Sequence, residues 1–143
     1  IVPGITSGIA ASSYFGIPLT HRNGASTVTF VTGHETSEKK EKSVNWRQLA
    51  YASDSLVIYM GIRNIEFIVR ELLIGGMESI TKCAVIQEAT LHNQKSLITE
   101  LSDLPKEIAK NNIKPPAIVI IGKIVDFKVN NNITKLSTVN LRN

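Results

Sequence analysis

The sequence predicts an α/β fold: a three-layer sandwich in which helices cover both faces of a mixed, mainly parallel sheet. Short β-branched runs alternate with helical patterns along the chain, which is typical of such layers. Residues 55–60, "SLVIYM", form an apolar run bounded by Asp54 and Gly61, as expected of a buried parallel strand. Residues 65–73 place apolar side chains at i, i+3, i+4, i+7 and i+8, which predicts one buried helix face.

The first elements are predicted to be a helix and a strand. Thr6 and Ser7 precede the small residues 8–15, and hydroxyl side chains in that place are typical of a helix N-cap. Gly16 is expected to end this helix, because glycine readily takes the left-handed conformation of a helix terminus. Residues 27–32, "TVTFVT", alternate and are β-branched, which predicts a strand.

The central elements follow from capping residues and charge. The polar residues 34–43 predict a surface loop. Asn45 is expected to cap a short helix that carries Trp46, and Asn64 is expected to cap the amphipathic helix described above. Gly75 and its neighbouring glycine would close that helix.

The remaining pattern predicts two strands, a helix and a last strand. The strands cover residues 82–88 and 95–101, and Ser102 is expected to cap a helix that runs to about Lys110. Consecutive prolines then block a helix, and residues 117–127 predict a strand bent at Gly122. Residues 1–127 would form one domain, and the Asn-rich tail 128–143 is expected to be frayed.

Composition limits the class of function. The 143 residues are 43% hydrophobic and carry a net charge of +4, which fits an anionic ligand but is too weak to indicate nucleic acid. No apolar run approaches the ~18–20 residues that cross a bilayer, so no membrane span is expected. Cys83 stands alone and is interpreted as an inert core residue. The chain begins with Ile1 rather than Met, and we expect it to be truncated at its N-terminus.

Candidate binding residues stand where predicted strands end, which is where open α/β sheets bind ligands. Thr6 and Ser7 at a helix N-terminus would favour an anionic group, Met60 offers an adaptable surface, and Ala89 with Thr90 suits a flat ligand. Each also has a plain structural explanation: a capped helix, a core methionine and an ordinary loop.

Two polar pairs are candidates for a ligand site, and only the first is retained. His21 and Arg22 follow an apolar turn; they are either solvated loop residues or, with arginine as a bidentate partner, contacts for carboxylates. His34 and Glu35 lack a second histidine at ligand spacing, so no metal site is expected.

Five segments together carry a family resemblance. In chain order they are VPGITSGIAASSYFGIPLTHR, STVTFVTGHE, LVIYMG, AVIQEAT and PPAIVIIGKIV. They closely resemble the C-terminal half of the tetrapyrrole methylases, from Ile1 to about Phe127. The resemblance implies an S-adenosylmethionine-dependent C-methyltransferase that converts uroporphyrinogen III to precorrin-2, for sirohaem or cobalamin. It also implies two α/β domains with a cleft between them, a homodimer, and a cytoplasmic location, or the plastid stroma in a photosynthetic eukaryote.

The resemblance also assigns roles to residues. Those matching cofactor contacts are Thr6, Ser7, Tyr59, Met60, Ala89, Thr90, Pro116, Ala117 and Ile118. His21 and Arg22 match a segment that would face a substrate rich in carboxylates. No catalytic acid or base is assigned, and the chain is expected to be inactive without the other half of the cleft. The alternatives are a related methylase acting on a later corrin precursor and a non-catalytic binding or dimerisation module.

Overall fold

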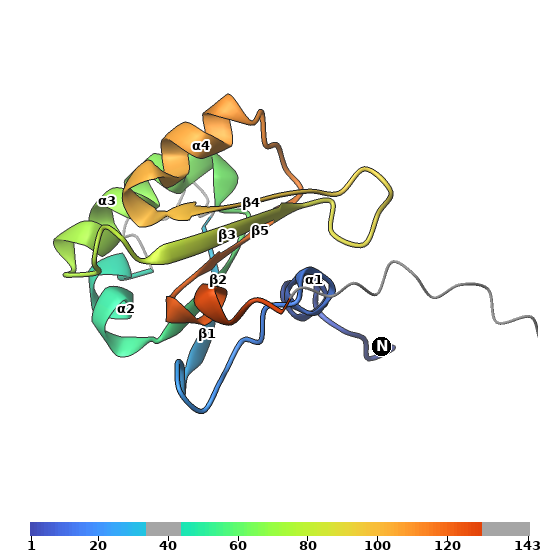
Figure 1. The fold of residues 1–143 in the computed structure, drawn as a ribbon, viewed down its shortest axis with the longest axis horizontal. Helices are drawn as coiled ribbons and strands as arrows, with labels where there is room; N and C mark the ends of the chain where they lie inside the picture. Colours follow the sequence, from blue (N-terminus) through green and yellow to red (C-terminus); the bar gives the residue numbers. More distant parts are fainter. Residues whose placement is uncertain (34–43, 130–143) are drawn as a thin grey trace, which may run out of the picture.

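The computed structural model describes residues 1–33 and 44–129 (Figure 1). The predicted loop at 34–43, and all of the predicted tail beyond Val129, lie outside the described residues. Its helices and strands are α1 (Ser7–Phe15), β1 (Val28–Thr32), α2 (Trp46–Ala52), β2 (Ser55–Tyr59), α3 (Ile65–Ile74), β3 (Lys82–Gln87), β4 (Lys95–Glu100), α4 (Leu104–Lys110) and β5 (Ala117–Ile121). Short 3₁₀ turns follow as η1 (Ile62–Asn64), η2 (Leu101–Asp103) and η3 (Lys123–Phe127).

The sheet is mixed, as predicted, with the strand order β1-β2-β5-β3-β4. The expectation of mainly parallel pairing is wrong. Only β1 and β2 pair in parallel among the described strands, and β5 runs antiparallel to both of its neighbours. The β3–β4 pair is antiparallel because the short loop 88–94 permits a hairpin and is too short for a crossover.

Helices cover both faces of this sheet, which confirms the three layers (Figure 1). Leu56 and Ile58 of β2 belong to the apolar core beneath α2, α3 and α4. Val57, between them, belongs to a second core beneath α1 and η3. Alternate residues of one strand therefore supply both cores, which explains why the run reads as apolar throughout.

The amphipathic helix α3 packs as its periodicity predicts. Ile65, Ile68, Val69 and Leu72 are buried against the sheet, and burial of each such side chain stabilises the fold by about 1.5–3 kcal/mol. Asn64 occupies the N-cap position, but its side-chain amide donates to the carbonyl oxygen of Gly33 at 2.7 Å. That bond ties the start of α3 to the end of β1 rather than capping the helix.

Two predicted boundaries near the C-terminus are wrong. Ser102 does not cap a helix: it lies inside η2, and α4 begins at Leu104 with Asp103 at its N-cap position. The last strand ends at Ile121 instead of Phe127. Gly122 has φ 140° and ψ 166°, a conformation that only glycine adopts readily, and it turns the chain out of the sheet into η3.

Asp54 fastens the chain before β1 to the start of β2. Its Oδ2 accepts hydrogen bonds from the backbone N–H groups of Ser26 (2.9 Å) and Thr27 (3.0 Å) and from the Thr27 hydroxyl. These donors, the Ser26 N–H foremost, hold the pKa of Asp54 below its ordinary value of 3.8.

We expect Asp54→Ala to lower the free energy of unfolding at pH 7, by less than about 1 kcal/mol because the carboxylate is exposed to solvent. A lowered native pKa stabilises the fold above the unfolded value of about 4 and ceases to do so as the pH falls through the native pKa. Urea unfolding at pH 7 and pH 3 should therefore show a smaller difference from wild type at pH 3. The exposed Glu78→Ala is the control, and an equal loss at both pH values would contradict the assignment.

Candidate functional site

One edge of the sheet brings together the predicted strand-end residues. β1, β2 and β3 point the same way, since β2 and β3 both run antiparallel to β5. Gln87 at the end of β3 pairs with Ala117 at the start of β5. Met60 and Glu88 directly follow β2 and β3, and Pro116 directly precedes β5, so these three residues meet at this edge.

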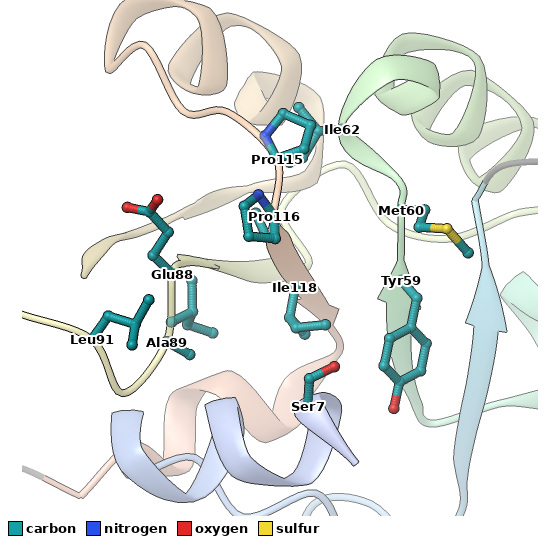
Figure 2. Close-up of a pocket in the computed structure, with 12 residues that line it drawn as sticks. Ser7, Tyr59, Met60, Ile62, Glu88, Ala89, Leu91, Pro115, Pro116 and Ile118 are labelled. Atoms are coloured by element: carbon teal, nitrogen blue, oxygen red, sulfur yellow. The ribbon is translucent and has the colours of Figure 1, made fainter. Parts of the chain in front are cut away.

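A cavity of about 580 Å³ opens at this edge, beside the N-terminal end of α1 (Figure 2). Its volume lies within the roughly 300–1,000 Å³ that small-molecule sites occupy. The lining residues are Ser7, Tyr59, Met60, Ile62, Ile86, Glu88, Ala89, Leu91, Pro115, Pro116, Ala117 and Ile118. Apolar side chains and a few polar groups thus make a wall of the kind that binds a partly aromatic ligand.

Two lining residues adopt strained backbone conformations. Met60 has φ 52° and Glu88 has φ 49°, both in the left-handed region that non-glycine residues avoid. Each stands directly after a strand, and the Glu88 N–H donates to the carbonyl oxygen of Pro116 at 3.0 Å, which holds the β3 tip against the start of β5. Such strain persists where the surroundings enforce it, and it concentrates at binding sites.

The N-terminal end of α1, which packs on the second core, forms one side of the cavity. Ser7 lies on the cavity wall, whereas the hydroxyl of Thr6 pairs with the Tyr59 hydroxyl at 2.7 Å instead of capping the helix. Gly8 permits this approach, because a Cβ there would lie 2.5 Å from the Tyr59 hydroxyl and 2.8 Å from Val57. Thr6 therefore does not line the cavity itself but orients Tyr59, which does.

The structure gathers most of the predicted cofactor contacts on this wall. Those that line it are Ser7, Tyr59, Met60, Ala89, Pro116, Ala117 and Ile118. Thr6 is one bond away, through Tyr59. Thr90 does not line the cavity; its N–H donates to the side-chain oxygen of Gln94 at 2.8 Å within the β3–β4 loop.

His21 and Arg22 do not line this cavity. The His21 ring stacks on Phe127 with centroids 4.2 Å apart, and its backbone pairs with Ala25. His21 borders a separate, open hollow with Pro18 and Phe127 at the C-terminal end of α1. Arg22 is exposed beside it.

Sequence reasoning missed several lining residues. They are Ile62, Ile86, Glu88, Leu91 and Pro115. Glu88 is the notable one, because it is the only carboxylate among the lining residues that the structure describes. Its position directly before Ala89, at the end of a predicted strand, could have indicated that it lies at the cavity.

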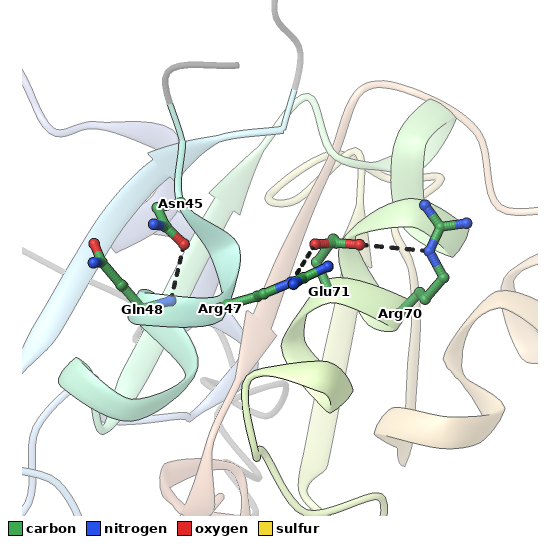
Figure 3. A network of polar contacts seen from close by, with 5 residues as sticks. All are labelled: Asn45, Arg47, Gln48, Arg70 and Glu71. Carbon is green, nitrogen blue, oxygen red and sulfur yellow. Dashed lines mark hydrogen bonds and ion pairs between the residues drawn. The ribbon is translucent and has the colours of Figure 1, made fainter. Parts of the chain in front are cut away.

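A polar cluster lies on α2 and α3 (Figure 3), and none of its residues lines the cavity. Asn45 caps α2 by accepting from the Gln48 N–H at 3.2 Å, as predicted. Arg47 pairs with Glu71 of α3 at 2.8 Å, and Arg70 approaches the same carboxylate at 3.6 Å. The Arg47 hydrogen bond lowers the pKa of Glu71. The cluster joins α2 to α3 and offers no unpaired acid for chemistry.

The described part of the chain contains no group of three or more His, Cys, Asp or Glu side chains placed to hold a metal ion. Burial raises the pKa of the Cys83 thiol far above its ordinary value, which makes it a poor nucleophile. Within the same residues, no helix has the length and apolar character to span a bilayer.

Comparison with known proteins then decides the family. The family signature of the Tetrapyrrole (Corrin/Porphyrin) Methylases matches residues 1–105. The chain belongs to the tetrapyrrole methylases. This confirms the family that the sequence segments resemble.

Individual tetrapyrrole methylases share both sequence and fold with the chain. It is 45% identical over 127 residues to uroporphyrinogen-III C-methyltransferase of Bacillus subtilis, covering 89% of this chain and 49% of that protein. The Synechocystis enzyme of the same name is 42% identical over 130 residues, covering 91% and 49%. A Thermus thermophilus uroporphyrin-III C-methyl transferase complexed with S-adenyl homocysteine superposes with a TM-score of 0.71 at 27% identity, covering 88% and 53%. The chain thus spans about half the length of these relatives.

Proposed function

We propose that the chain is the C-terminal half of an S-adenosylmethionine-dependent C-methyltransferase that converts uroporphyrinogen III to precorrin-2, on the route to sirohaem and cobalamin. The cavity at the shared strand edge carries this proposal, because it collects the residues that the family resemblance assigns to the cofactor. The names of the relatives support the substrate, and the Thermus complex supports a ligand of the S-adenosylhomocysteine class.

The cavity fits the cofactor's chemistry. Apolar side chains such as Ala89 and Ile118 suit the flat base, and the exposed Met60 offers an adaptable surface at the rim. The bound cofactor supplies the methyl group, and this chain's residues bind it, orient it and exclude water. Methyl transfer depends chiefly on alignment in a low-polarity cleft, so no acid or base is assigned to these residues.

His21 and Arg22 remain proposed contacts for substrate carboxylates. His21 borders a hollow separate from the cavity, and Arg22, the next residue, is exposed. A ligand touching both places must be larger than the cavity, which suits a tetrapyrrole with many carboxylates. We propose that the second half of the cleft, and a second copy of the protein in a homodimer, complete the substrate site.

The test measures ligand binding before activity. S-adenosylhomocysteine is titrated calorimetrically into the chain alone, and into the chain mixed with the half of the Bacillus subtilis relative that it does not match. We expect binding in the mixture at least as tight as to the chain alone, with homocysteine as the non-binding control. The mixture should then methylate uroporphyrinogen III.

Two outcomes would count against the proposal. Absence of S-adenosylhomocysteine binding in both preparations would leave a non-catalytic module as the better interpretation. Activity on a later corrin precursor, with none on uroporphyrinogen III, would identify a related methylase instead.

A further inference from the structure

We propose that Glu88 reads the base of the nucleoside ligand, by accepting a hydrogen bond from the 6-amino group of adenine. The inference rests on the proposed function, because it takes the ligand to be an adenosine compound. Glu88 lines the cavity, and no other charged side chain does so among the described residues. Figure 2 shows it at the border of the cavity, beside Ala89 and Leu91.

The backbone of Glu88 is fixed on both sides. Its N–H donates to the Pro116 carbonyl oxygen at 3.0 Å, and its own carbonyl oxygen accepts from the Leu91 N–H at 3.1 Å. These bonds hold the residue at φ 49°, a conformation that a glutamate would not choose freely. The side chain therefore leaves the β3 tip in one defined direction.

The carboxylate is also oriented. Its Oε2 accepts from the Asn93 side-chain amide and, at 3.4 Å, from the Gln87 side-chain amide. Gln87 is itself held, because its oxygen accepts from the Lys114 N–H at 2.7 Å. Both amides bind Oε2, and Oε1 makes no hydrogen bond to the residues described. The hydrogen bonds to Oε2 thus orient the carboxylate, and Oε1 remains available to accept a hydrogen bond from a ligand.

The neighbouring wall suits a flat ring. Ala89 has the smallest side chain of the wall residues beside Glu88, and the apolar side chains of Ile86, Pro116 and Ile118 contribute to the same cavity. A planar base between such side chains has only its edge left for polar recognition. A carboxylate can only accept, and the 6-amino group of adenine can only donate there, so the two match. A 6-oxo group would place two acceptors against each other, which disfavours binding.

The experiment compares S-adenosylhomocysteine with S-inosylhomocysteine, in which the 6-amino group is replaced by a 6-oxo group and the neighbouring N1 carries a hydrogen. Their dissociation constants are measured calorimetrically for wild type, Glu88→Gln and Glu88→Ala, in the reconstituted mixture described above. We expect wild type to prefer the amino compound by about tenfold or more, the usual effect of one unmatched polar pair. Glu88→Gln should bring the ratio near one, because its amide can turn either an acceptor or a donor toward the ring.

Glu88→Ala should weaken the amino compound and also reduce the ratio, since no partner remains. Glu66→Gln, an exposed change on α3 outside the cavity, is the matched control and should keep the wild-type ratio. Thermal unfolding verifies that each variant is folded. A ratio unchanged in both Glu88 variants, with S-adenosylhomocysteine still bound, would overturn this inference alone. Wild type that binds neither compound would overturn the proposed function as well.

Discussion

Ala89→Leu should weaken S-adenosylhomocysteine binding by about a hundredfold or more. Ala89 lies on the cavity wall, partly buried against the core beneath α1. A leucine at this position would place its added atoms in the space that a flat ligand needs. Overpacking of a formed site costs up to about 3 kcal/mol, which corresponds to that loss of affinity.

Stability should change little in Ala89→Leu, because the added side chain extends into the cavity rather than into the core. Calorimetric titration gives the affinity, and urea unfolding gives the stability. Ala52→Leu, an exposed change on α2 outside the cavity, makes the same substitution and should bind normally. Undiminished binding by a folded Ala89→Leu would show that the ligand does not occupy this cavity.

Gly122→Ala should cause the largest loss of stability, at least about 3 kcal/mol in the free energy of unfolding. Gly122 has φ 140° and ψ 166°, a region that is nearly exclusive to glycine. A Cβ there would also overlap the carbonyl oxygen of Asp54 and lie 3.3 Å from the Cα of Ser55. Both obstacles are backbone atoms at the start of β2, so neither can move without disturbing the sheet.

Gly76→Ala separates the two causes. Gly76 also has a positive φ, 94°, but a Cβ there meets nothing within 4 Å. This variant should lose only the conformational term, about 1 kcal/mol. Urea unfolding measures both variants, and equal losses would mean that the close approach to Asp54 contributes nothing.

Local pattern determined most of the elements. The i, i+3, i+4 spacing in residues 65–73 was enough to predict α3, because a helix with one apolar stripe must bury it. The continuous apolar run before Met60 was enough to predict a strand covered on both faces, which β2 is. The strand-end positions of Met60 and Ala89 likewise predicted candidate contacts, since strand ends are where open sheets bind ligands.

Partners distant in sequence decided the rest. The pairing direction of β5 depends on where the chain returns after α4, and no pattern within residues 117–121 encodes it. Gly122 ends that strand because of Asp54, far away in sequence. Thr6 carries the expected N-cap signal, yet its hydroxyl bonds Tyr59, and His21 stacks on Phe127 rather than facing the cavity.

The sequence by itself therefore determined where most helices and strands lie, and that Met60 and Ala89 stand at strand ends. Only the tertiary structure decided which tips share one cavity and that Glu88 joins them with an oriented carboxylate. The physical reason is the sequence separation over which each kind of interaction acts. Periodicity and capping act within a few residues, whereas a cavity is made by backbones that approach each other after the sheet has formed.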